Sequence, residues 1–147
     1  MLVVSVLAAS IGCGDPLRPA DIAGTYVLER VGDDPLPAVV QSRSTFQIVA
    51  IADTIHLRRD GSGTRTTITV MLLPDGETYP AFRTAVGVRF EIIRGKVRIF
   101  SQFTCPSNAN CALPAPLVVS RVAGGLRSVR ESLDKPVLFF ARVEDAD

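Results

Sequence analysis

Apolar and polar residues alternate along most of the chain after residue 21. In Thr54–Arg59, Ile55 and Leu57 would lie on one face of a strand, with polar residues between them on the other face. A period of two is typical of strands that bury one face. Glycine, proline, aspartate and asparagine interrupt the alternation at short intervals, and no segment has the spacing of a long amphipathic helix. The pattern therefore predicts an all-β domain.

Turn residues divide this region into short strands. Asp60-Gly61-Ser62-Gly63 is a strong hairpin signal. An irregular stretch is expected to hold a strand over Pro37–Val40 that continues into Thr45–Ile51. The other strands are expected over Thr25–Val31, Thr54–Arg59, Thr64–Leu72, Ala85–Ile93, Val97–Phe103, Leu117–Val122, Leu126–Glu131 and Pro136–Val143.

Successive short strands joined by hairpins favour an antiparallel up-and-down meander. Closure of the meander into a small barrel of about eight strands would remove exposed sheet edges. A two-sheet β-sandwich is the alternative.

The apolar positions of these strands form sets on one face, which we expect to share the barrel interior. Their side chains are mostly of medium size, and the chain has seven phenylalanines, two tyrosines and no tryptophan. The interior therefore either keeps a ligand-sized cavity or is just filled by its own side chains, as an eight-stranded barrel can be. The residues expected to line such a cavity are Ile55, Leu57, Ile68, Val70, Val86, Val88, Phe90 and Ile92.

The first residues of the chain differ in character from the rest. Residues 1–12 contain no charged side chain, and Leu2–Ile11 form an apolar run. The run is too short for a membrane-spanning helix, which needs about 20 apolar residues, but it has the length of a signal-peptide core. We expect residues 1–12 to be a signal peptide; the alternative is a first buried strand of the domain.

The segment Ala9-Ser10-Ile11-Gly12-Cys13 resembles the lipobox of bacterial lipoproteins. The resemblance implies that Cys13 receives a diacylglycerol, that the signal is removed before it, and that the new amino group is acylated. Two signals anchor a protein stably to a membrane, whereas one acyl chain binds only marginally. The implied location is the bacterial cell envelope. Because Gly14 replaces the aspartate that retains some lipoproteins in the inner membrane, we expect the outer membrane, facing the periplasm or the cell surface.

The chain after the signal is expected to hold a tether and one domain. Pro16 and Pro19 discourage helix in residues 13–20, which we interpret as the lipidated cysteine and an extended tether. Residues 21–147 are of a length that fits one domain. The formal net charge of +1, from 16 basic and 15 acidic residues, gives no indication of a nucleic-acid partner.

Two cysteines, Cys105 and Cys111, lie close together in a polar segment that is rich in turn residues. We expect a local disulfide between them, which an exported protein can form. A metal site or two free thiols is the alternative, but the chain offers one histidine and no Cys-x-x-Cys pair as further ligands.

The start and end of the domain resemble the lipocalin-like domains of bacterial lipoproteins. The similar segments are Ile22-Ala23-Gly24-Thr25-Tyr26-Val27-Leu28 and Leu36-Pro37-Ala38, with the Cys105-Pro106 loop and the apolar last strand ending in Arg142. Lipocalins carry Gly-x-Trp in the first strand and pack an arginine from the last strand over the ring. The resemblance implies that Gly24, Tyr26 and Arg142 close the barrel, with tyrosine in place of tryptophan.

The sequence contains no recognisable catalytic set, metal-ligand set or cofactor motif. Ser62 is interpreted as a turn residue, and His56 as a residue on the polar face of its strand with no identified partner for base catalysis. We therefore expect a non-enzyme without cofactor or metal. Its partners would be the membrane, through the anchor, and a small apolar or amphipathic ligand; the alternative is a non-catalytic interaction or structural module with a packed barrel, whose protein partner the sequence does not name.

Overall fold

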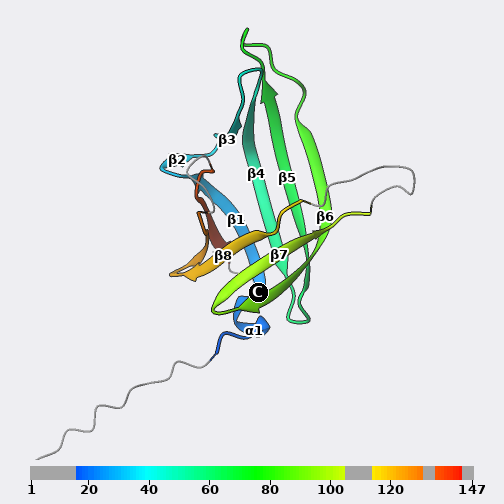
Figure 1. Cartoon of the computed structure of the whole chain (residues 1–147), viewed down its shortest axis with the longest axis vertical. Helices are drawn as coiled ribbons and strands as arrows, with labels where there is room; N and C mark the ends of the chain where they lie inside the picture. Colours follow the sequence, from blue (N-terminus) through cyan, green and yellow to red (C-terminus); the bar gives the residue numbers. More distant parts are fainter. Residues whose placement is uncertain (1–15, 105–113, 131–134, 144–147) are drawn as a thin grey trace, which may run out of the picture.

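The computed structural model describes residues 16–104, 114–130 and 135–143. Within these ranges a short helix, α1 (Pro19–Ile22), precedes ten strands (Figure 1). The strands are β1 (Gly24–Val31), β2 (Asp34–Pro35), β3 (Ala38–Ser42), β4 (Gln47–Leu57), β5 (Ser62–Leu72), β6 (Phe82–Ile93), β7 (Lys96–Gln102), β8 (Leu117–Val122), β9 (Gly125–Ser128) and β10 (Leu138–Val143).

Eight of these strands form a closed antiparallel barrel. Strands β4 to β10 pair in chain order, and β1 closes the circle because it pairs with β10 on one side and with β4 on the other. The two extra strands, β2 and β3, pair with β1 and β4. The predicted all-β, up-and-down barrel of about eight strands is therefore confirmed, in preference to the sandwich.

Most strands lie within a few residues of their predicted positions, but β4 differs. Thr45–Ile51 was predicted to continue a strand from Pro37–Val40, with Thr54–Arg59 as the next strand. The structure instead separates β3 from β4 and joins the last two stretches in one strand of 11 residues, Gln47–Leu57. A register shift around Ile51 marks a β-bulge. The extra residue shifts the alternation of apolar and polar positions by one. The sequence pattern is therefore interrupted at the bulge, although the strand itself continues.

The packed structure begins a few residues before Asp21, the predicted start of the domain. Pro19 occupies the first position of α1, where a missing N–H leaves no hydrogen bond unmade. Asp21 accepts a hydrogen bond of 2.8 Å from the backbone N–H of Arg18. Leu17 packs against the core and Ile22 is fully buried. The helix therefore lies against one end of the barrel, which we name the α1 end (Figure 1).

No helix in the part of the chain that the structure describes has the length and apolar character needed to cross a membrane.

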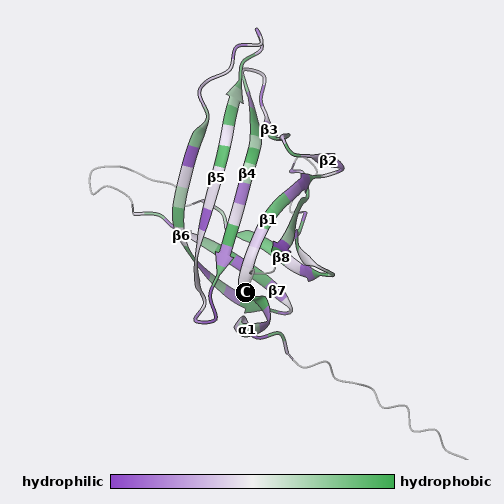
Figure 2. Ribbon diagram, turned by 180° about the vertical axis from the view of Figure 1, so that it is seen from behind, coloured by the Kyte–Doolittle hydropathy of each residue, from purple (hydrophilic) through white to green (hydrophobic). Residues whose placement is uncertain are grey.

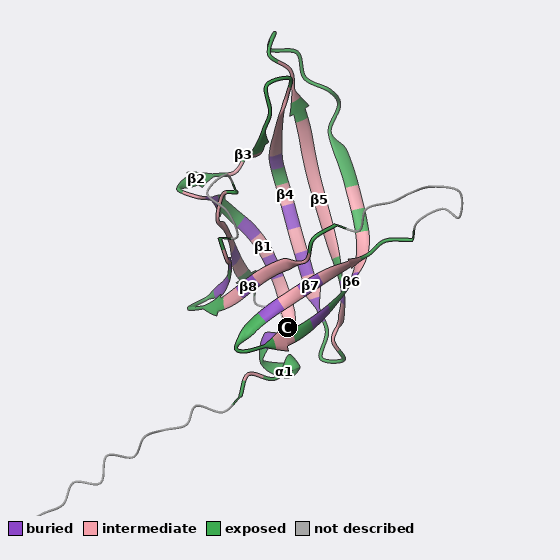
Figure 3. Ribbon diagram, viewed as in Figure 1, coloured by how far each residue is buried: buried purple, intermediate pink, exposed green. Residues whose placement is uncertain are grey.

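The apolar core consists of inward-facing side chains that alternate with polar ones along the strands (Figure 2). Figure 3 shows the buried positions recurring along β1, β4 and β7. Complete burial of one such side chain stabilises a fold by about 1.5–3 kcal/mol. The largest core residues, each at most 7% exposed, are Ile22, Tyr26, Leu28, Ile55, Leu57, Phe90, Ile99, Leu126 and Phe140.

Strand β5 turns Arg65, and not its large apolar residues, toward the interior. The ladder pairs Arg65 with the buried Ile55, and directly paired residues share a face of the sheet. Ile68 and Val70 are three and five residues after Arg65, and successive side chains of a strand alternate between its faces. Both therefore lie on the outward face, contrary to the prediction. Alternation within β5 defines two faces, but the register set by the β4–β5 hairpin decides which one is buried.

Candidate binding site

Asp53 and Arg65 form a salt bridge on the inner wall of the barrel. Nε of Arg65 lies 3.0 and 3.2 Å from the two carboxylate oxygens of Asp53, and Nη2 donates to Oδ2 as well. The side chain of Asp53 is 6% exposed and that of Arg65 is 22% exposed. A buried carboxylate is tolerated when it is paired and hydrogen-bonded, and this two-pronged arrangement provides both. Asp53 and Ser128 are the two buried polar residues among the described ones, and Asp53 is the charged one.

The β4–β5 register brings these two residues together. Asp53 pairs with Thr67, and Arg65 is the next inward-facing residue of β5. Diagonal neighbours on one face lie within reach of a long side chain. The sequence analysis missed the pair because Asp53 stood at the predicted break in β4. Counting outward from the Asp60–Gly63 hairpin would have indicated it.

A hollow of about 190 Å³ lies beside this pair, at the end of the barrel opposite α1, which we name the far end. Arg65 lines it from β5, and Leu117, Ser128 and Leu138 line it from β8, β9 and β10. Because β5 and β8 are not neighbours in the sheet, the hollow reaches across the barrel interior. The Ser128 hydroxyl accepts a hydrogen bond of 2.7 Å from the N–H of Leu138, which fixes its position in the wall.

The predicted cavity-lining residues separate into three groups, none of which lines this hollow. Four belong to the packed core: Ile55, Leu57, Val88 and Phe90. Two are partly buried and pack against the core: Val86 and Ile92. Two face outward: Ile68 and Val70. The hollow is instead lined by Arg65, Leu117, Ser128 and Leu138 together with their neighbours.

The three residues predicted to close the barrel do meet at the α1 end. Tyr26 and Arg142 are direct partners in the β1–β10 ladder, and a Cβ on Gly24 would lie 3.0 Å from Nε of Arg142. The Arg142 guanidinium donates a hydrogen bond of 2.8 Å to the carbonyl oxygen of Ala23. Among the described residues, the cation–π contacts involve other arginines, and Arg142 does not stack on the ring. Closure therefore uses a backbone hydrogen bond in place of the predicted stacking.

The Tyr26 hydroxyl donates a hydrogen bond of 2.7 Å to the carbonyl oxygen of Ile22 and so joins the barrel to α1. Burial raises the pKa of the Tyr26 phenol above its ordinary value of 10.0, and the charges of Arg142 and Arg121 offset part of this rise. The phenol is therefore a neutral hydrogen-bond donor at physiological pH.

The two residues considered for catalysis have structural partners. His56 Nδ1 lies 2.9 Å from the hydroxyl of Thr25. The two residues pair directly between β1 and β4, and both face outward because they alternate with the buried Tyr26 and Ile55. Ser62 donates hydrogen bonds to the Asp60 carboxylate from its hydroxyl and its N–H, at 2.7 and 2.9 Å. These bonds lower the pKa of Asp60 and fix the hairpin turn.

The predicted lipidation site, Cys13, and the predicted disulfide, Cys105 with Cys111, lie outside the described residues. Within the described ranges, no group of three or more histidine, cysteine, aspartate or glutamate side chains is placed to hold a metal ion.

The structure is a small antiparallel β-barrel with a packed apolar core and a hollow beside Arg65 at the far end. Comparisons with protein-family models, with curated proteins and with solved structures give no match for this chain.

Proposed function

We propose that this chain is a lipoprotein of the bacterial cell envelope, anchored through Cys13, and that its barrel binds a small amphipathic ligand at the far end. The ligand proposal rests on one observation: the hollow beside the Asp53–Arg65 pair has walls from opposite sides of the barrel. The ligand would be held without a chemical step. His56 and Ser62 support this reading, because their polar atoms serve the sheet and the hairpin.

The walls of the hollow combine polar and apolar residues, which suits an amphipathic ligand. The side chain of Arg65 is 22% exposed and is oriented by Asp53, and Lys135 is a second basic residue of the lining. Leu117, Leu138 and neighbouring prolines provide the apolar surface opposite. An apolar cavity of about 150 Å³ can hold benzene, so a space of about 190 Å³ accepts a group slightly larger than that. A larger ligand would extend out of the far end.

The position of α1 supports an anchor at the opposite end from the hollow. Pro16 is the third residue after Cys13, and the chain reaches the barrel through α1. A lipid on Cys13 would therefore hold the α1 end near the membrane. The far end would face away from the bilayer, accessible to a ligand.

The anchor is tested by Cys13→Ala in the producing bacterium. We expect the variant to lose labelling by a radioactive fatty acid and to accumulate with residues 1–12 uncleaved. A wild-type protein that matures at another position and carries no lipid would contradict the anchor.

The ligand site is tested on protein that begins at Gly14, which retains all described core residues. We expect saturable binding of an environment-sensitive apolar dye, and we expect Leu117→Trp to weaken it because the indole fills the hollow. Val39→Trp is the matched control, since Val39 is 41% exposed on β3. Leu138→Trp provides a second blocking variant, and circular dichroism establishes that each variant is folded. Equal binding by all variants, or no binding by the wild type, would contradict the site.

One observation favours the alternative, a non-catalytic interaction or structural module. The outward faces of β3, β4 and β5 carry apolar residues, including Val39 and Ile51, each 41% exposed, as well as Ile68 and Val70. Exposed apolar patches on a protein surface often mark sites of protein–protein contact. If the dye test is negative, this alternative becomes the leading proposal.

A further inference from the structure

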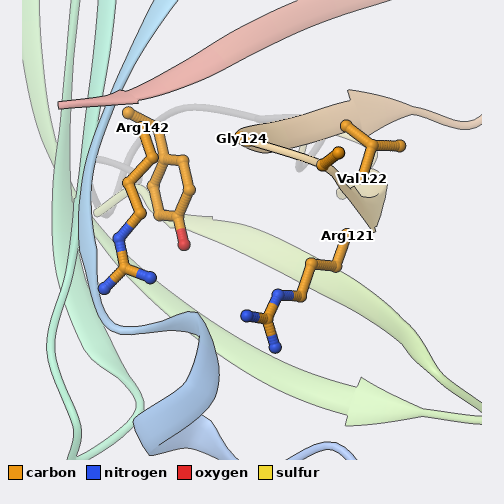
Figure 4. A pocket seen from close by; sticks show the side chains of 7 residues that line it. Arg121, Val122, Gly124 and Arg142 are labelled. Carbon is orange, nitrogen blue, oxygen red and sulfur yellow. The ribbon is translucent and has the colours of Figure 1, made fainter.

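A second hollow, of about 480 Å³, lies at the α1 end of the barrel, outside the packed core. It is lined by Tyr26, by Arg142 from β10 and by Arg121 from β8, together with the turn between β8 and β9. Figure 4 shows the side chains of Arg121 and Arg142 a short way apart, both extending toward the end of the barrel where α1 lies. Aspartate and glutamate are absent from its described lining.

The pairing register of the strands places both arginines on the face of the sheet that borders this space. Arg121 pairs directly with the fully buried Leu126, and Arg142 pairs directly with the buried Tyr26. Both side chains therefore belong to the inward face of the barrel wall. The buried core ends at Tyr26 and Leu126. Arg121 and Arg142 therefore lie at the edge of the inward face, where it meets solvent at the α1 end.

The hydrogen-bonding capacity of these arginines is largely unused. In the described ranges, no hydrogen bond or ion pair involves the guanidinium of Arg121. Arg142 donates one hydrogen bond, to the Ala23 carbonyl, out of the five N–H donors that a guanidinium carries. The coulombic influence of both arginines on the Tyr26 phenol is consistent with two positive charges directed at one place.

The described residues around the hollow add positive charge. Arg142 also lines a neighbouring hollow of about 660 Å³ together with Arg58 and Arg59. Two carboxylates of this end already accept hydrogen bonds, Asp21 from Arg18 and Asp60 from Ser62. An anion that enters between Arg121 and Arg142 would therefore meet unpaired donors.

We propose that the hollow between Arg121 and Arg142 binds a phosphate group. Two forked guanidinium groups match the oxygens of phosphate, to which arginine binds in a bidentate manner. A phosphate group, either as the free ion or as a phosphodiester, is tetrahedral and presents at least two anionic oxygens, so it can accept hydrogen bonds from both guanidinium forks at once. The source is either dissolved phosphate or the headgroup of a phospholipid, which the position of α1 after the proposed anchor would bring close. The site itself is independent of the far-end ligand and of lipidation.

The test is calorimetric titration of the mature full-length protein, in a non-ionic detergent and a phosphate-free buffer, with inorganic phosphate. We expect saturable binding that Arg121→Gln weakens about tenfold, as expected for loss of a charged hydrogen-bonding partner. Arg83→Gln, an equal change of charge on β6 far from the hollow, should leave the dissociation constant within about twofold. Arg121 is exposed, and its side chain makes no hydrogen bond or ion pair with the described residues, so its replacement should not impair folding, which a thermal melt verifies.

A second arm adds phosphatidylglycerol or, as the control without phosphate, diacylglycerol to the detergent. Competition between phosphatidylglycerol and phosphate would identify a headgroup as the source, and phosphate binding without that competition would identify the dissolved ion. Absence of phosphate binding, or equal binding by wild type and Arg121→Gln, would overturn the site. Neither outcome depends on the Cys13 or dye experiments, so the proposals fail separately.

Discussion

The Asp53–Arg65 pair is the most consequential single contact in the barrel interior, because it places charge next to a packed apolar core. Both residues come from adjacent strands, and Asp53 is the more deeply buried partner. A buried pair contributes little net stability when intact, but removal of one partner leaves the other uncompensated. The interior therefore depends on the pair being complete.

Asp53→Asn should lower the free energy of unfolding by about 2–3 kcal/mol. This is less than the roughly 3–5 kcal/mol expected when one partner of a fully buried pair is removed, because Arg65 retains contact with solvent. Urea denaturation followed by circular dichroism measures the change. Asp33→Asn is the control, since its fully exposed carboxylate lies 3.9 Å from Arg30 and should contribute little to stability. Equal effects of the two substitutions would show that Asp53 is not buried as described.

Tyr26 provides a pH-dependent prediction. Since burial raises its folded-state pKa above 10.0, its contribution to stability is fully present below the unfolded pKa and is lost as the pH rises through the folded pKa. In a Tyr79→Phe background Tyr26 is the only tyrosine, and phenolate absorbance should report ionisation above pH 10. Arg121→Gln removes a positive charge that lowers this pKa, so it should raise the pKa further. A decrease would show that Arg121 does not face the phenol.

At the scale of the elements, the strand succession was predictable because turns and alternation are local signals. The α1 helix was not, since a single turn beginning at a proline has no periodicity to detect. The continuity of β4 was hidden by the bulge at Ile51. The inner face of β5, and with it the Asp53–Arg65 pair, depends on hairpin register. The hollow depends on how far the core side chains fill the barrel, which alternation alone does not determine.

The pairing of β9 with β10 requires a small residue at Gly125. A Cβ there would overlap the backbone carbonyl oxygen of Phe140, and paired backbones cannot move apart without loss of ladder hydrogen bonds. Gly125→Ala should therefore destabilise the barrel by about 1–3 kcal/mol, the usual cost of overpacking. Gly87→Ala is the control, because its Cβ would meet only the flexible end of Gln102, at 2.8 Å. Thermal melts should separate the two variants, and similar melting temperatures would contradict the close approach.

The segment between β7 and β8 contains Cys105 and Cys111, whose disulfide stays a prediction from the sequence. Peptide mapping of the exported protein without reduction should recover the two cysteines as one linked peptide. Reduction should change local proteolysis at this segment more than the melting temperature of the barrel, because the closed loop is short. Two alkylatable thiols in native protein would contradict the bond.

At the scale of the whole molecule, the two ends of the barrel differ in chemistry. The α1 end carries the arginine-lined hollows and lies next to the chain segment that follows Cys13. The far end has a smaller hollow, with an apolar wall, the oriented Arg65 and Lys135. This polarity unites the proposals: the protein would face the membrane with its basic end and receive a ligand at the other.

The most direct test of this account is native mass spectrometry of the protein isolated from its own cell envelope. We predict a fraction of molecules that carries a small noncovalent ligand, which is released on collisional activation and is absent from Leu117→Trp but present in Val39→Trp. A single unliganded mass for the wild type, or a ligand retained equally by Leu117→Trp, would contradict the proposed binding site at the far end.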